Sequence, residues 1–390
     1  MTETEKSLYD QYRRIIPALA ISAIGALFYN ILPLYVGAAQ DSLGLSDSTV
    51  GLLPAAFFLG YNVITLSAFF WIRHWNWRRA SLVWLPLGLF GLLLSLKTNS
   101  TLALFGGTVI AGGGFAALYG IGTTILADTS NPARWYGVKI ATETMPGAIL
   151  LLVLPSTWVA EFGFSGVVYG LLAATLLLAM FLPTLPGSGA PEDSRHSPAG
   201  NDDAITTNNK LPIWMALIGT LLFFSAASGL WAFIERMGAE LSFDAEAIGI
   251  LLAMTLVFAT LGSLTTAWIG KRFGNVGPFM LSSAMLFTAT LILYGTPSFP
   301  LYSLGTTLLT FGIGMGLPFA VAEIAELDFD GRFIILSVPA IGLGAMIGPA
   351  SAGYLIESAS FNGVLLTAGP GVILAAVFLK TGRVLAARNL

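Results

Sequence analysis

The sequence has no cysteine, two histidines and few charged side chains. Of its 390 residues, 55% are hydrophobic and 10% are charged, whereas a soluble domain has about 25% charged residues. The missing cysteine excludes disulfides, thiolate metal sites and cysteine nucleophiles. Both histidines, His74 and His196, fall in polar loops, which argues against a histidine proton relay within apolar segments. Because so little charge cannot cover a soluble protein of this length, we expect the chain to lie in a lipid bilayer.

Further absences narrow the function. The net charge is −3 and no basic stripe is present, so no nucleic-acid partner is expected. The glycine runs lie inside apolar segments and lack the lysine of a phosphate-binding loop, and no metal-ligand spacing occurs. We therefore expect no cofactor, no metal and no enzymatic activity. The polar, acidic start of the chain differs from a cleaved signal peptide.

Apolar runs of about 17–25 residues, the length that crosses a bilayer as a helix, organise the chain. Twelve runs occur, six on each side of a polar segment at 184–212 that is rich in Pro, Gly, Ser, Asn and Asp and is typical of a flexible linker. We expect an all-α integral membrane protein with six-helix bundles at 1–183 and 213–390. The expected spans are 15–38, 50–72, 80–96, 101–127, 136–160, 165–183, 213–237, 248–269, 277–295, 301–327, 333–356 and 363–379.

Lysine and arginine predict the orientation, because they gather on the cytoplasmic side of membrane proteins. If the amino terminus is inside, all of the 18 Lys and Arg residues except Lys97 and Arg236 fall on the cytoplasmic side. We therefore expect a multi-pass protein of the cell (inner) membrane with both termini and the linker in the cytoplasm. An even number of spans agrees with this orientation.

An internal repeat relates the two halves. The stretch 112–134 (GGGFAALYGIGTTILADTSNPAR) resembles 312–332 (GIGMGLPFAVAEIAELDFDGR). Two parallel six-span halves are a common transporter plan, with the solute site near the bilayer midplane between them. The shared residues are Gly112, Gly114, Asp128 and Arg134, which return as Gly312, Gly314, Asp328 and Arg332.

Local motifs add a family resemblance. One known loop signature is an acidic residue followed by Arg-x-Gly and further basic residues. The segment WIGKRFGNVG, between the eighth and ninth expected spans, keeps Arg272 and Gly274 of this signature. The segment WIRHWNWRRAS, between the second and third, keeps its basic cluster. The segment GLGAMIGPASAG in the eleventh expected span is similar to a glycine-proline helix motif. With the six-plus-six layout, these features resemble the major facilitator superfamily over nearly the whole chain. The resemblance implies twelve helices in two pseudo-symmetric bundles and secondary transport.

Ionisable residues within apolar spans are functional candidates, because burying a charge is costly unless it is paired. Glu143 lies roughly 13 Å beyond Arg134 along the fifth span, and Lys139 stands four residues earlier on the same face. Glu143 is therefore a candidate for proton coupling, with a structural Lys139–Glu143 bridge as the alternative. Glu323 has the same spacing from Arg332 and is a second candidate, with a gate salt bridge as its alternative.

Other candidates are polar or lie near the outer surface. Glu235 and Arg236 stand near the outer end of the seventh span, with Trp231 one turn before Glu235. Arg236 could hold an anionic group of a solute or belong to an outer gate. Amides and tyrosines could bind a solute or only join helices. These uncharged candidates are Tyr29, Asn30, Tyr61, Asn62 and Tyr119. The candidates for a cytoplasmic gate are Asp128, Arg134, Lys139, Arg272, Asp328 and Arg332.

The sequence thus predicts a secondary active transporter that moves a small organic solute by alternating access, coupled to protons through Glu143 or Glu323. A monomer in the bilayer is expected. One alternative is a passive facilitator whose buried charges form gates. A membrane sensor or scaffold is a further alternative, but such proteins usually carry a folded soluble domain, and the longest polar segment here is the linker.

Overall fold

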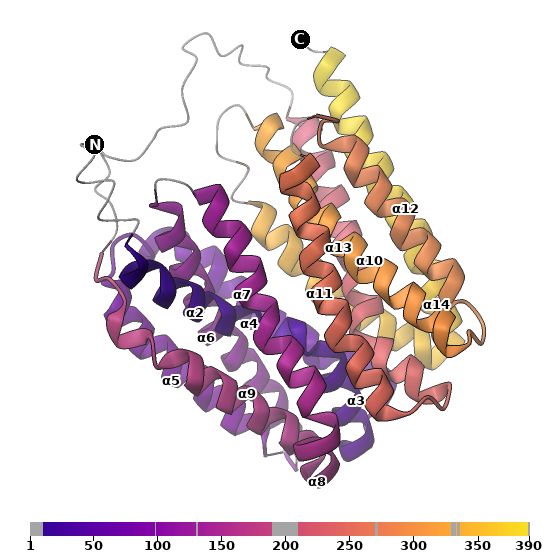
Figure 1. Cartoon of the computed structure of the whole chain (residues 1–390), viewed down its shortest axis with the longest axis horizontal. Helices are drawn as coiled ribbons and strands as arrows, with labels where there is room; N and C mark the ends of the chain where they lie inside the picture. Colours follow the sequence, from indigo (N-terminus) through magenta and orange to yellow (C-terminus); the bar gives the residue numbers. More distant parts are fainter. Residues whose placement is uncertain are drawn as a thin grey trace.

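The computed structural model describes residues 11–97, 99–129, 132–188, 210–269, 272–328, 333 and 336–388. Every regular element in these ranges is a helix, as predicted. The helices form two groups, drawn from indigo to magenta and from pink to yellow in Figure 1. The expected linker falls largely at 189–209, outside the described residues.

The first group supplies the first six spans. Its central helix, α6, packs against α2, α4 and α5. Its elements are α2 (Tyr12–Asn30), α3 (Leu32–Leu43), α4 (Asp47–Trp71), α5 (Trp77–Ser95), α6 (Thr101–Ala127), α7 (Pro132–Val153), the π-helix η1 (Pro155–Val159), α8 (Ala160–Phe162), α9 (Phe164–Ala179) and the 3₁₀-helix η2 (Leu182–Thr184).

The second group supplies the other six spans. Its helix α13 packs against α11 and α12, and α10 packs against α14. Its elements are α10 (Leu211–Glu240), α11 (Ala245–Ile269), α12 (Val276–Leu293), α13 (Phe299–Leu327) and α14 (Ser337–Arg388). We call the end of the molecule where α2 and α10 begin and α14 ends the linker end, and the end where α3 and α10 end the far end (Figure 1).

Twelve spans follow from the described helices. Nine are long and apolar enough to cross a membrane, and α2 and α3 together make a tenth that is bent by 48°. Ala359 and Ser360 leave the helical conformation inside α14, so this element is two spans. The helix α5, with 19 residues, is the twelfth.

The first span is a broken helix, whereas the sequence predicts one continuous run. Ile31, between α2 and α3, has a non-helical backbone. Pro33, near the start of α3, has no N–H to donate to the carbonyl of Tyr29, four residues back. The indole of Trp231 in α10 donates to that carbonyl instead, at 2.9 Å.

Glycines let the helices of each half approach closely, and they define the register of the repeat. A Cβ at Gly112 would collide with the carbonyl of Phe57, and one at Gly60 with that of Val109, so α4 and α6 touch along their backbones. The second half repeats this pattern between α11 and α13. The equivalent contacts are Gly314 on Ala259 and Gly262 on Phe311. By packing, the partner of Gly112 is thus Gly314, two residues later than the sequence repeat indicates.

Equivalent turns join the last two spans of each half. Gly163, between α8 and α9, has a φ of 56°. Ser360 occupies the corresponding turn with a φ of 58° and a ψ of −177°, a region that only glycine adopts readily. Both turns are followed by phenylalanine, Phe164 and Phe361.

Ser360→Gly is therefore expected to stabilise the protein by about 1 kcal/mol, because glycine relieves the backbone strain. The measurement is the thermal unfolding midpoint in detergent. Ser358→Gly, two residues earlier in helical conformation, is the control and should lower stability by about 0.5–1 kcal/mol. Equal shifts in the same direction for both variants would contradict the strain at Ser360.

Candidate functional site

A buried ion pair lies in α7, roughly 16 Å from the start of the helix at the usual rise per residue. Lys139 Nζ is 2.6 Å from Glu143 Oε1, and both side chains are almost fully buried. Ser22 of α2 donates to the same oxygen at 2.5 Å. Asn30 Nδ2 donates to the main-chain carbonyl of Glu143 at 2.7 Å. The cluster therefore holds α2 and α7 together while keeping one cation and one carboxylate inside an apolar bundle.

Aromatic rings extend from this pair across the first half. Lys139 Nζ lies 3.9 Å from the ring centre of Tyr119, a cation–π contact. The Tyr119 and Tyr61 rings are 6.1 Å apart, and the Tyr61 and Phe58 rings 5.9 Å apart. The Phe58 ring is in turn 6.2 Å from that of Tyr29. We call Tyr119, Tyr61, Phe58 and Tyr29 the aromatic row.

The aromatic row ends against the second half. The ring of Tyr29 stacks at 5.4 Å on Phe224 of α10. Its hydroxyl is buried and has no hydrogen-bond partner among the described residues. The amide of Asn62 is also buried without a partner in the described chain, and it lies against Gly342 of α14. These are polar groups whose bonding capacity is unused.

The far end brings α3 and α10 together. The carboxyl group of Glu235 lies against Gly37, where a Cβ would collide with Oε2. That oxygen is buried and has no hydrogen-bond partner in the described chain. Arg236 Nη1 instead pairs with Asp41 of α3 at 2.6 Å. Consecutive residues on a helix do not face each other, so Glu235 and Arg236 point to different partners.

Glu323 differs in its surroundings from Glu143. Its side chain is fully buried, and it lies 3.6 Å from Arg383 and 3.2 Å from the amide of Asn275. Arg383 and Asn275 also bind Glu326, at 2.8 and 2.7 Å. Glu323 thus belongs to a charge cluster that joins α13 to the end of α14. Sequence reasoning missed Arg383 as a partner, because the two residues are distant in sequence.

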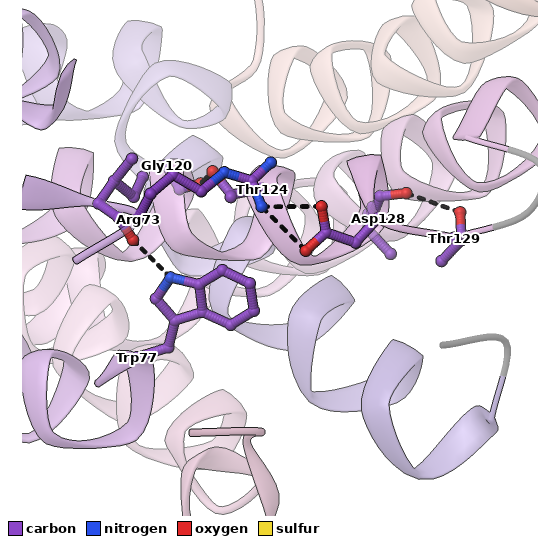
Figure 2. A network of polar contacts seen from close by, with 8 residues as sticks. Arg73, Trp77, Gly120, Thr124, Asp128 and Thr129 are labelled. Atoms are coloured by element: carbon purple, nitrogen blue, oxygen red, sulfur yellow. Dashed lines mark hydrogen bonds and ion pairs between the residues drawn. The ribbon is translucent and has the colours of Figure 1, made fainter. Parts of the chain in front are cut away.

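The gate candidates lie at the linker end. Arg73, just after α4, binds both carboxylate oxygens of Asp128 through Nη1, at 2.8 and 2.9 Å. Figure 2 shows this bridge above the indole of Trp77, which donates to the carbonyl of Ile72. Asp128, the C-cap residue of α6, thus joins α6 to the end of α4. Sequence patterns alone do not pair Arg73 with Asp128, since the two residues are 55 positions apart in the chain.

The remaining gate candidates lie near the ends of α11 and α13 or outside the described residues. Asp328 accepts a hydrogen bond from the backbone of Phe333 at 2.7 Å. Arg272 is exposed. The side chain of Arg134 and the whole of Arg332 lie outside the described residues.

Two six-helix halves, with a buried ion pair in the first half and contacts between the halves at the far end, have the architecture of a membrane transporter. The chain belongs to the major facilitator superfamily, whose family model matches residues 18–325. It is a multi-pass membrane protein and a transporter of small solutes.

Similar proteins include a gentisate transporter of Corynebacterium glutamicum, 24% identical over 94% of this chain and 87% of the relative. A glucose facilitated diffusion protein of Zymomonas mobilis is 30% identical over 34% of this chain and 32% of its own length. Among solved structures, the nucleoside transporter NupG matches with a TM-score of 0.73 and 16% identity, covering 95% of this chain and 99% of the other. A D-xylose-proton symporter matches with a TM-score of 0.69 and 14% identity, over 94% and 97% of the two chains. At these identities the structural likeness concerns the fold.

Proposed function

We propose that the protein is a proton-coupled carrier of small aromatic acid anions that works by alternating access as a monomer. The observation that carries the proposal is Lys139, a buried cation at one end of the aromatic row. Its ammonium group can bind a carboxylate, and the neighbouring tyrosine rings can stack on an aromatic ring. The similarity to a gentisate transporter supports the same class of solute.

Proton coupling follows from competition for Lys139. In the structure, Glu143 Oε1 forms a salt bridge with Lys139 Nζ at 2.6 Å. A solute carboxylate that bound Lys139 would deprive Glu143 of its cation. A carboxylate buried without a cation is strongly disfavoured and takes up a proton instead. One anion and one proton would thus bind together, and releasing the anion would restore the Lys139–Glu143 pair and free the proton.

Contacts between the halves support a conformation closed at the far end. Beside the α3–α10 contacts, the backbone N–H of Ser48 donates to Glu357 of α14 at 3.2 Å. Farther along, Thr144 of α7 and Thr260 of α11 share a hydrogen bond of 2.8 Å. The distribution of lysine and arginine leads us to expect the linker end in the cytoplasm, and this conformation would then be closed to the outside. The bundles 1–183 and 213–390 would then rock about these contacts.

Glu143→Gln is expected to lower proton-driven gentisate accumulation about tenfold while leaving gentisate exchange measurable, because glutamine fills the same volume but cannot carry a proton. The measurement is uptake of labelled gentisate into proteoliposomes under an imposed pH gradient, with D-xylose and a nucleoside as neutral solutes. Glu240→Gln at the exposed end of α10 is the matched control. Full gradient-driven accumulation by Glu143→Gln would exclude Glu143 as the coupling group, and preferred uptake of a neutral solute would exclude the anion class.

A passive facilitator is the second candidate. The observation that favours it is that Lys139 and Ser22 both bind Glu143 Oε1, as expected for a fixed brace between α2 and α7. In that case an imposed pH gradient would drive no accumulation in the parent protein, although gentisate would still exchange across the membrane.

A further inference from the structure

The α3–α10 contact contains a carboxyl group that forms no salt bridge with any described residue. Glu235 projects from α10, in the second half, onto Gly37 of α3, in the first half. Its Oε2 atom is buried, and no described residue bonds to it. The adjacent cation, Arg236, is held by Asp41. Glu235 Oε2 is therefore covered at the contact between the two halves, and no cation of the described residues forms a salt bridge with it.

The charged groups around Glu235 favour its neutral form. Asp41 of α3 contributes a negative charge to the same contact, although Arg236 partly offsets it. Tyr302 of α13 lies near Glu235, but its hydroxyl donates to the carbonyl of Ile234 at 2.7 Å and not to Glu235. A buried carboxylate with such neighbours is disfavoured relative to the protonated acid.

The remaining ionisable groups of this region are engaged elsewhere or face outward. Asp47 of α4 accepts a hydrogen bond from Gln40 at 2.6 Å. Glu357 of α14 accepts one from the backbone of Ser48. Glu240 at the end of α10 and Glu246 in the first turn of α11 are exposed. None of these contacts supplies Glu235 with a cation.

We propose that Glu235 is a proton-binding latch of the far end, separate from the Lys139–Glu143 pair. With a proton bound, its carboxyl group fits against Gly37 and the two halves stay together. When α3 and α10 separate, water reaches the carboxyl group, the proton leaves and the resulting charge opposes closure. Protonation from the far side thus favours the closed far end, and alkaline conditions favour the open one.

The absence of cysteine from the 390 residues allows a direct test by spin labelling at introduced cysteines. Spin labels at Ala160→Cys and Ala239→Cys, two exposed alanines of the first and second half, report the separation of the far end by pulsed electron resonance. In the parent protein, a shift from acidic to alkaline buffer should move the distance distribution toward a longer separation. Glu235→Gln should keep the short distance at every pH, since glutamine stays neutral. Glu240→Gln is the matched control and should behave like the parent.

A second variant tests the same contact from the other side. Gly37→Ala places a methyl group where the Glu235 carboxyl group lies, so it should favour the long distance even in acidic buffer. The double variant Gly37→Ala/Glu235→Ala removes the collision and should restore the short distance independently of pH. The proposal is overturned if Glu235→Gln keeps the pH-dependent shift, or if the parent shows none. Because no solute is needed, these outcomes do not depend on which solute is carried.

Discussion

Lys139→Met is expected to abolish gentisate uptake and to lower stability by about 3–5 kcal/mol, because it leaves Glu143 buried without its cation. Lys139 Nζ is 2.6 Å from Glu143 Oε1, and the side chains retain only 6% and 10% of their exposure. Solvent therefore screens the pair little, and methionine preserves most of the volume of the lysine stem. The measurements are the unfolding midpoint in detergent and uptake into proteoliposomes.

The double variant Lys139→Met/Glu143→Gln separates stability from function. Neutralising both partners removes the uncompensated charge, so most of the lost stability should return. Anion uptake should remain absent, because the site still lacks its cation. If Lys139→Met alone unfolds like the parent, the pair is not buried as the structure describes. If the double variant transports gentisate normally, Lys139 is not the anion ligand.

Gly112→Val is expected to have the second large effect, a loss of about 3 kcal/mol of stability together with transport activity. A Cβ at Gly112 would overlap the carbonyl of Phe57, which is backbone and cannot rotate away. The helices α4 and α6 would have to separate, and the packing of the first half would be disturbed. Gly314→Val should act alike, because its Cβ would meet the carbonyl of Ala259.

Gly106→Val provides the matched control within the same helix. A Cβ at Gly106 meets no atom within 4 Å, while the change in helix propensity is the same. This variant should unfold within about 1 kcal/mol of the parent. Similar losses for Gly106→Val and Gly112→Val would show that propensity, rather than contact between the helices, causes the effect.

The number and position of the spans could be predicted from the sequence because lipid requires long apolar helices. The tenth expected span, 301–327, differs by two residues at its start from α13 (Phe299–Leu327). The break at Ile31 could not be predicted in the same way. Pro33 accompanies that break, yet Pro54 and Pro146 lie inside continuous helices. Proline alone therefore does not determine where a membrane helix divides.

The candidate site was predictable only where its partners are close in sequence. Lys139 and Glu143 are four residues apart, so a helix places them on one face. Ser22, the other partner of Glu143, lies 121 residues away and depends on how α2 packs against α7. Glu323 and Glu143 have the same spacing from Arg332 and Arg134, which suggested equivalent surroundings. The spacing could not indicate that Arg383 of α14 lies 3.6 Å from Glu323. Whether either carboxylate couples transport to protons stays a prediction.

The broken first span makes the two halves mechanically unequal. Its counterpart in the repeat, α10, is one continuous helix of 30 residues, whereas α2 and α3 meet at 48°. The hydrogen bond from the Trp231 indole to the Tyr29 carbonyl joins α10 to the break between α2 and α3 in the other half. A movement of α10 would therefore be transmitted to the break at Ile31, whereas α10 itself contains no such break. In the proposed alternating-access cycle, the inward and outward half-cycles should consequently have different rate-limiting steps, although the two halves repeat one helix-packing pattern.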